Sequence, residues 1–197
     1  MRDTKEKILN ESLALFSVRG YDGVSMSDIA ANVGIKAASI YKHYSGKEDI
    51  FRSIVQRFEE KTEHIFSPSI LNHTEYVNIS TEMLIGMIQL TFQKYAKEPF
   101  LSKCRKLFMI SSFDKPEIGD LYVKYLITVP MQYQAELFTV LQKEKNANTK
   151  DTSIMAYHFY SPILILLQEY DYRRVTLKEA LKKIEAIVTQ FVEVYKI

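Results

Sequence analysis

Apolar residues recur at helical spacing along almost the whole chain, and no alternating strand pattern is present. The first apolar stripe comprises Ile8, Leu9, Leu13 and Phe16. Gly20 follows Arg19 as a helix stop, and Asp3 and Glu6 have the spacing of a capping box. The pattern therefore predicts a capped first helix that ends at Gly20.

Two short helices separated by a glycine turn are predicted next. Ser25 and Asp28 have the spacing of a capping box, and Gly34 ends the helix that they start. The inward face of this helix comprises Met26, Ile29, Ala30 and Val33. A second helix over about 36–44 would bury Ile40. Two such helices joined by a short turn are a helix-turn-helix.

The outward residues of the second helix suit the major groove of DNA. Ala37 and Ala38 are small enough for close approach and can touch a thymine methyl, while Ser39 can bond a base edge or a phosphate. Residues 29–47 contain no acidic side chain, and Lys47 stands at a helix start that favours anions. The predicted DNA-binding residues are Ser25, Lys36, Ala37, Ala38, Ser39, Tyr41, Lys42, His43 and Lys47.

At these residues the sequence resembles the TetR family of bacterial transcription regulators. The stretches that carry the resemblance are KEKILNESLALFSVRGYDGVSMSDIA and IYKHYSGKEDIF, in roughly the first quarter of the chain. The sequence departs from the family pattern at three positions, and this departure affects the predicted base contacts but not the predicted fold. Lys36, Ala37 and Ala38 stand where family members usually have Ser or Thr, a polar residue and glycine.

Helices are predicted throughout the rest of the chain, which gives an all-α fold. A long fourth helix over 47–66 would connect a helix-turn-helix domain (1–47) to a helical effector-binding and dimerisation domain (48–197). The further predicted helices are near Glu75–Ala96, Phe100–Ser112, Glu117–Lys145, Thr152–Glu169 and Leu177–Tyr195. Pro130 and Pro162 would each release a backbone hydrogen bond.

The middle helices are rich in Met, Tyr and Phe, and the family resemblance implies that they enclose an inducer pocket. Aromatic walls with Met and a few polar groups suit a hydrophobic or amphipathic small molecule. The candidate pocket residues are Met83, Met87, Phe108, Tyr125, Gln132 and Tyr157. For any single one of them, plain core packing is the stronger explanation.

The last two helices carry apolar stripes that suit close packing against a partner helix. The residues predicted for a dimer interface are Phe159, Ile163, Leu166, Tyr170, Leu181, Ile184, Val188 and Phe191. Periodicity does not distinguish such an interface from packing within one chain. The resemblance implies a symmetric homodimer, and two-fold symmetry then implies an inverted-repeat operator on double-stranded DNA.

Other classes of function find little support in the sequence. The 197 residues carry a net charge of only +2, with one cysteine, Cys104, in an apolar context that predicts a buried thiol. The histidines show no metal-binding spacing, and no glycine-rich phosphate loop or nucleophile elbow is present. We therefore expect no enzyme, metal or cofactor, and no membrane association, which favours the bacterial cytoplasm and the nucleoid when DNA is bound.

These observations predict a ligand-responsive repressor that a hydrophobic inducer releases from a palindromic operator. Two alternatives stay open at this point. The second domain could dock a protein partner in place of a small molecule, or the protein could bind small molecules with no role at DNA.

Overall fold

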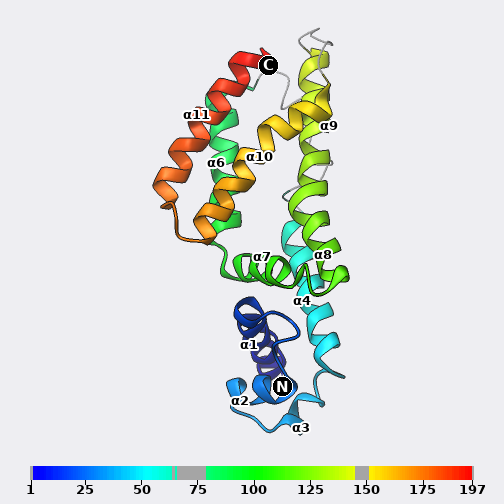
Figure 1. Ribbon diagram of the computed structural model, residues 1–197. Coiled ribbons are helices and arrows are strands. Elements are labelled where there is room, and N and C mark those ends of the chain that lie inside the picture. The colour runs from blue at the N-terminus through cyan, green and yellow to red at the C-terminus, as the bar shows by residue number, and fades with distance from the viewer. Residues whose placement is uncertain (1, 64, 66–78, 145–150, 197) are drawn as a thin grey trace. The chain divides into compact units, whose positions relative to one another are not determined.

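The structure is a computed structural model that describes residues 2–63, 65, 79–144 and 151–196. Over these residues the chain forms helices and turns without any strand, which confirms the all-α prediction (Figure 1). The helices are α1 (Arg2–Arg19), α2 (Met26–Val33), α3 (Ala37–Ile40), α4 (Lys47–Thr62), α6 (Thr81–Lys97), α7 (Pro99–Ser111), α8 (Pro116–Val123), the π-helical turn η2 (Lys124–Thr128), α9 (Val129–Glu144), α10 (Thr152–Asp171) and α11 (Leu177–Tyr195).

Most predicted helix ends agree with the structure, because local caps set them. α11 spans Leu177–Tyr195 as predicted, and Thr176 and Glu179 form a capping box at its start. α7 begins at Pro99, where the Glu98 side chain accepts a hydrogen bond from the backbone N–H of Leu101. The breaks predicted at Ser67–Pro68 and Asn146–Asn148, and the helix start at Glu75, lie outside the described residues.

The capping box predicted for the first helix is wrong. α1 already contains Asp3 in its first turn. The Glu6 carboxylate instead pairs with the guanidinium of Arg57 on α4, with 2.6 Å between Arg57 Nη2 and Glu6 Oε2. This hydrogen-bonded guanidinium holds the pKa of Glu6 below its usual value. Local spacing did not reveal the pair, because its partners lie 51 positions apart.

The chain packs as two compact units. The first unit comprises Met1–Glu63 and Glu98–Tyr122, so it combines α1 to α4 with α7 and most of α8. Phe58 of α4 meets Phe108 of α7 edge to face, with 5.2 Å between ring centroids. The Ser111 hydroxyl accepts a hydrogen bond from the backbone N–H of Tyr21 at 3.0 Å. The grouping differs from the boundary expected after residue 47, because α1 and α4 bury apolar surface against α7.

Cys104 of α7 lies in the core of the first unit. Its side chain is fully buried, as predicted. Burial raises the pKa of the thiol well above its usual value, so the reactive thiolate form is disfavoured. Cys104 is therefore a packing residue.

The second unit comprises His64–Lys97 and Val123–Ile197 and contains α6, α9, α10 and α11. Three aromatic rings form the centre of its core. Phe138, Phe159 and Phe191 have centroids 4.9 to 5.3 Å apart. Ile184 and Val188 of α11 are fully buried in the same unit. The apolar stripe of α11 is thus used inside the chain.

The chain changes its hydrogen-bond register just before Pro130. In η2 the backbone N–H of Val129 donates to the carbonyl of Lys124. Pro130 has no N–H, so the carbonyl of Leu126 lacks its ordinary α-helical donor. The Tyr160 hydroxyl of α10 donates to this carbonyl at 3.0 Å. A side chain therefore replaces the backbone bond that the proline removes.

Candidate DNA-binding site and effector pocket

The helix-turn-helix is formed by α2 and α3 of the first unit (Figure 1). The predicted capping box of Ser25 and Asp28 is present at the start of α2. Gly34 ends α2 with φ of 79°, a left-handed conformation that glycine adopts at little cost. Lys36 is extended and precedes α3. The polypeptide therefore turns between the helices as the sequence predicts.

The second helix of the motif is shorter than predicted. α3 ends at Ile40, and residues 41–43 form a turn. The backbone N–H of His43 donates to the carbonyl of Ile40, three residues back, which tightens the chain beyond the helix. Ile40 is fully buried, and the buried Tyr44 donates its hydroxyl hydrogen to the carbonyl of Lys5 at 3.3 Å. The turn of residues 41–43 is therefore anchored by a buried side chain at each end.

The predicted contact residues of this segment lie at or near the surface. Lys36, Ala38, Tyr41 and Lys42 are exposed, and Ala37, Ser39 and His43 are half-buried. Tyr41 is 57% exposed, although aromatic side chains usually bury most of their surface. Because residues 29–47 carry no acidic group, Lys36 and Lys42 give this surface a positive potential.

Lys47 has a structural role that the sequence did not reveal. Its ammonium donates to the backbone carbonyls of Tyr21 and Val24 at 3.0 Å each, and it lies 4.3 Å from the centroid of the Tyr21 ring. Burial lowers the pKa of Lys47. Two of its three protons are engaged, so Lys47 ties the start of α4 to the segment that precedes α2.

Ser25 is engaged in the cap of α2. Its hydroxyl accepts from the backbone N–H of Asp28 at 3.1 Å and donates to the Asp28 carboxylate at 2.6 Å. Hydrogen bonds from Ser25 lower the pKa of Asp28 to about 2, and Arg19 contributes through a salt bridge at 3.3 Å. Phosphate contacts by Ser25 and Lys47 remain predictions, and both residues also hold the motif in shape.

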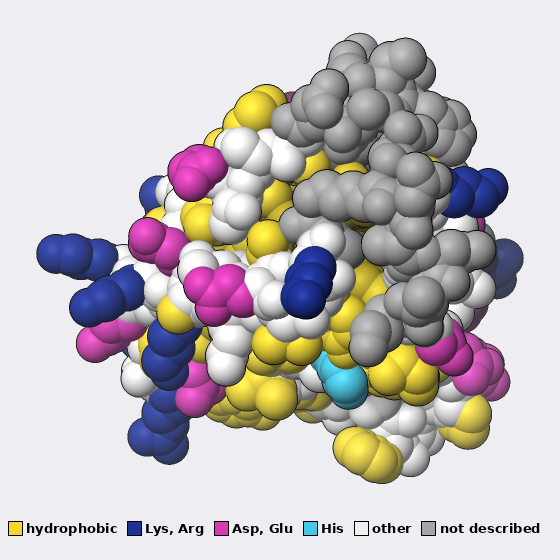
Figure 2. Space-filling view, turned by 90° about the horizontal axis from the view of Figure 1, so that it is seen from above, with side chains coloured by type: hydrophobic (Ala, Val, Ile, Leu, Met, Phe, Trp, Pro, Cys, Tyr) yellow, Lys and Arg dark blue, Asp and Glu magenta, His cyan; other side chains and the backbone are white. Residues whose placement is uncertain are grey.

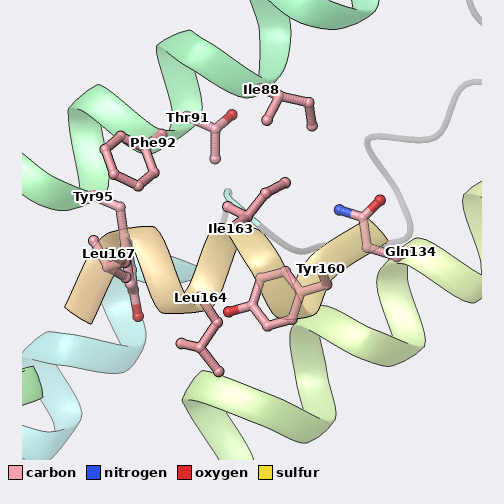
Figure 3. A pocket seen from close by; sticks show the side chains of 9 residues that line it. All are labelled: Ile88, Thr91, Phe92, Tyr95, Gln134, Tyr160, Ile163, Leu164 and Leu167. Carbon is pink, nitrogen blue, oxygen red and sulfur yellow. The ribbon is translucent and has the colours of Figure 1, made fainter. Parts of the chain in front are cut away.

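The second unit contains a hollow between α6, α9 and α10 (Figure 3). Its cavity volume is about 50 Å³. The lining residues are Ile88, Thr91, Phe92, Tyr95, Gln134, Tyr160, Ile163, Leu164 and Leu167. Gln134 is only 4% exposed, and its Oε1 atom has no hydrogen-bond partner. The hollow is thus mostly apolar, and the amide oxygen of Gln134 is a buried acceptor among its lining residues.

Comparison with known proteins relates the N-terminal segment to a family of regulators. The model of bacterial regulatory proteins of the TetR family matches residues 8–54, which contain α2, α3 and the start of α4. This N-terminal segment is therefore similar to the TetR family. Over 52 residues it is 48% identical to IcaR of Staphylococcus epidermidis, the HTH-type negative transcriptional regulator of the icaADBC biofilm operon. IcaR of Staphylococcus aureus strain Newman is 44% identical over 52 residues.

The sequence matches to these relatives cover only part of each chain. The matched segment is 26% of this chain and 28% of the length of these curated relatives. The relatives are transcriptional regulators and not enzymes.

Solved structures resemble the chain over nearly its full length. A proposed TetR-family regulator of Mesorhizobium loti has a TM-score of 0.71 at 22% identity and covers 98% of this chain and 96% of its own. A TetR-family regulator of Pseudomonas syringae pv. tomato has a TM-score of 0.68 at 16% identity and covers 95% and 94%. At these identities the likeness shows the fold alone.

The residues predicted for an effector pocket do not line this hollow. Phe108 belongs to the core of the first unit, and Tyr125 is buried with its hydroxyl 2.9 Å from the ammonium of Lys124. The other four are exposed: Met83, Met87, Gln132 and Tyr157. Met and aromatic content indicated suitable helices, but it did not indicate which of their faces turn inward.

Gln134 is the lining residue that sequence reasoning missed. It precedes Leu137, Phe138 and Leu141 at steps of three and four, so it occupies the buried face of α9. A polar residue within an apolar stripe was the available signal. The predicted Gln132 lies two positions earlier and therefore faces away.

Most residues predicted for the dimer interface are buried within the second unit. These are Phe159, Ile163, Leu166, Ile184, Val188 and Phe191, while Tyr170 and Leu181 are half-buried. Side chains that fill the core of one chain are not available to a second copy, so the interface prediction is wrong for these six. These six residues follow the alternative prediction, in which the apolar stripes pack within one chain.

Other apolar side chains of the same two helices are exposed. They are Ile154, Tyr157 and Ile165 of α10, Tyr172 directly after the end of α10, and Val194 of α11. Hydrophobic patches between charged side chains are visible on the molecular surface (Figure 2).

The remaining predictions concern histidines, metals and membranes. His158 is exposed and hydrogen-bonds the Tyr195 hydroxyl, whereas His64 and His73 lie outside the described residues. Among the described residues no three His, Cys, Asp or Glu side chains are grouped to hold a metal. In the same part of the chain, no helix has the length and apolar character needed to span a bilayer.

Proposed function

We propose that the protein is a transcriptional repressor that binds an inverted-repeat operator as a dimer and is released by a small molecule. The acid-free surface around α3 carries this proposal, because it combines exposed lysines with small residues on a helix-turn-helix. The 48% identity over 52 residues to a negative transcriptional regulator supports repression. Such a protein would act at the nucleoid in the bacterial cytoplasm.

The two kinds of DNA contact come from different residues of the segment. Tyr41 and Lys42 are exposed and offer a hydroxyl and a cation to phosphates. Ala37, Ala38 and Ser39 open the short helix and approach base edges. Loss of a phosphate contact should weaken binding to all sequences alike, whereas a change at the helix start should alter the preferred sequence.

Selection from a random duplex pool with the purified full-length protein tests DNA binding. We expect an enriched palindrome, and binding to it should weaken as salt rises. The Lys42→Ala variant should bind the palindrome and random DNA more weakly by a similar factor. Lys182→Ala of α11 removes the same charge from an exposed site of the second unit and serves as control. No enrichment above random DNA would contradict the proposal.

A second copy of the chain would cover the exposed apolar face of α10. Ile154 and Ile165 are eleven residues apart, which places them on one face of α10. Isologous contacts of this kind generate the two-fold symmetry that an inverted repeat requires.

The dimer is tested by measuring the molar mass in solution. Ile165→Glu should shift the protein from dimer to monomer, because it places a charge in the apolar contact. Val18→Glu of α1 introduces the same charge at another exposed position, where Val18 is 76% exposed. If both variants stay dimeric, a different face forms the interface.

The hollow of the second unit supports a small-molecule effector over a protein partner. Concave, mostly apolar sites with a few polar groups are typical of small-molecule binding. The Tyr160 side chain both lines this hollow and bonds the carbonyl of Leu126 beside Pro130. A ligand that moves Tyr160 would therefore disturb η2. Because η2 directly follows α8 in the chain, this change could be passed from the hollow to α8.

A further inference from the structure

We propose that the hollow accepts a neutral, mostly apolar molecule with one hydroxyl or amide N–H group that donates to Gln134 Oε1. This inference rests on the proposed function, because it assigns a chemical class to the effector. It concerns what the hollow selects and what it rejects.

The hollow rejects charged ligands. Its nine lining residues include no Asp, Glu, Lys, Arg or His. A carboxylate or an ammonium bound there would leave water without a counter-charge, and the transfer of an unpaired ion into an apolar site is strongly unfavourable. Fatty acids in their ionised form are therefore poor candidates, whereas neutral alcohols, phenols and amides are suitable.

Gln134 defines the polar contact. Its side chain extends from α9 toward the residues of α6 and α10 (Figure 3). A buried amide oxygen without a donor carries the full cost of lost hydration. A ligand O–H or N–H would remove that cost, and an ether of the same shape would not. The donor of the ligand is thus the feature that the site recognises.

Tyr160 shapes the hollow, and its hydroxyl hydrogen is already used in a bond within the protein. Its hydroxyl hydrogen is directed at the carbonyl of Leu126, with 3.0 Å between the oxygens. This bond holds the ring in place as one wall. Ile88, Phe92 and Ile163 add apolar surface from α6 and α10. These walls suit an aromatic ring or a short alkyl chain.

Three probes that share a para-propylphenyl group test this selection: para-propylphenol, its methyl ether and para-propylbenzoate. At pH 7 the phenol is neutral, as the side chain of tyrosine is, and the benzoate is ionised. Calorimetric titration into the full-length protein without DNA should give at least tenfold tighter binding of the phenol than of the ether, and the weakest binding for the benzoate. Equal binding of phenol and ether, tightest binding of the benzoate, or binding of none of the three would overturn the proposal.

Two glutamine variants separate the amide from the rest of α9. In Gln134→Leu the phenol and the ether should bind within twofold of each other, because the acceptor is gone. Gln132→Leu changes an exposed glutamine of the same helix and should keep the preference of the unchanged protein. A preference for the phenol that survives in Gln134→Leu would assign its donor to another group. Circular dichroism of each variant establishes that it is folded.

The outcomes for the ligand and for DNA are distinguishable. An enriched operator together with no phenol preference would leave the repressor standing and remove this ligand class. A phenol preference lost in Gln134→Leu, but without any operator, would retain the binding site and reject the proposed function.

Discussion

The helix-turn-helix and the hollow of the second unit use their polar groups in opposite ways. In the helix-turn-helix, Ser25 and Lys47 are engaged by neighbouring atoms of the same unit. In the hollow, the oxygen of Gln134 is buried without a partner. A DNA-reading surface needs a fixed shape, and internal hydrogen bonds provide it. An unsatisfied buried acceptor instead favours any molecule that completes it.

The same two regions differ in their likeness to other proteins. The first shares 48% of 52 residues with IcaR of Staphylococcus epidermidis. The second is part of a whole-chain likeness to solved structures, at 22% and 16% identity for the two proteins described above, which shows the fold alone. Function is carried by sites and not by folds, so the second unit has to be interpreted from its own side chains.

The largest effect on stability is expected for Lys47→Met. The substitution removes two hydrogen bonds from a charged donor to the carbonyls of Tyr21 and Val24. We expect the free energy of unfolding to fall by about 2 kcal/mol in urea denaturation. Lys42→Met removes the same charge from an exposed residue and should leave stability nearly unchanged. If Lys47→Met kept full stability and still lost DNA affinity, Lys47 would be a phosphate contact and not a tether.

The next effect concerns Tyr160→Phe in the second unit. Loss of the hydroxyl leaves the carbonyl of Leu126 without this donor, beside a proline that cannot supply one. We expect unfolding in urea to require about 1 kcal/mol less. Tyr157→Phe, three positions earlier and 55% exposed, is the matched control. Equal stability of both variants would mean that another group satisfies this carbonyl.

Gln134→Leu should change stability in the opposite direction. Replacement of a buried amide whose oxygen lacks a partner by an apolar side chain of similar size removes a desolvation cost, so we expect a gain of up to about 1 kcal/mol. The measurement is the midpoint of thermal unfolding without ligand, with Gln132→Leu as reference. A loss of stability would indicate that the amide is satisfied in the free protein.

The smallest effect is a dependence of stability on acid pH. The pKa of Asp28 lies at about 2 in the folded protein, against an ordinary value of 3.8. The unfolded chain therefore binds more protons in this pH range. The contribution of Asp28 to the stability of the folded protein is present above pH 3.8 and is lost as the pH falls toward 2. Between pH 4 and pH 2 the melting temperature of Ser25→Ala should fall less steeply than that of the unchanged protein. Ser27→Ala should follow the unchanged protein, and identical slopes in all three would contradict the assignment.

Local interactions made much of the fold predictable from the sequence. The capping box of Ser25 and Asp28, the left-handed Gly34 and the ends of α11 depend on residues within a few positions of one another. The exposed character of Lys36 and Lys42 follows from the same helical period that buries Ile40. The all-α fold and the helix-turn-helix were therefore determined by the sequence alone.

The tertiary structure decided which partner each apolar or polar group meets. A stripe such as that of Ile184, Val188 and Phe191 shows that a helix face is buried, but not whether another helix of the chain or a second copy buries it. Lys47 and Glu6 found partners more than twenty positions away, which no local spacing encodes. The incomplete contact of Gln134 likewise depends on how α6, α9 and α10 pack together, because burial and the loss of hydration arise only when those helices meet.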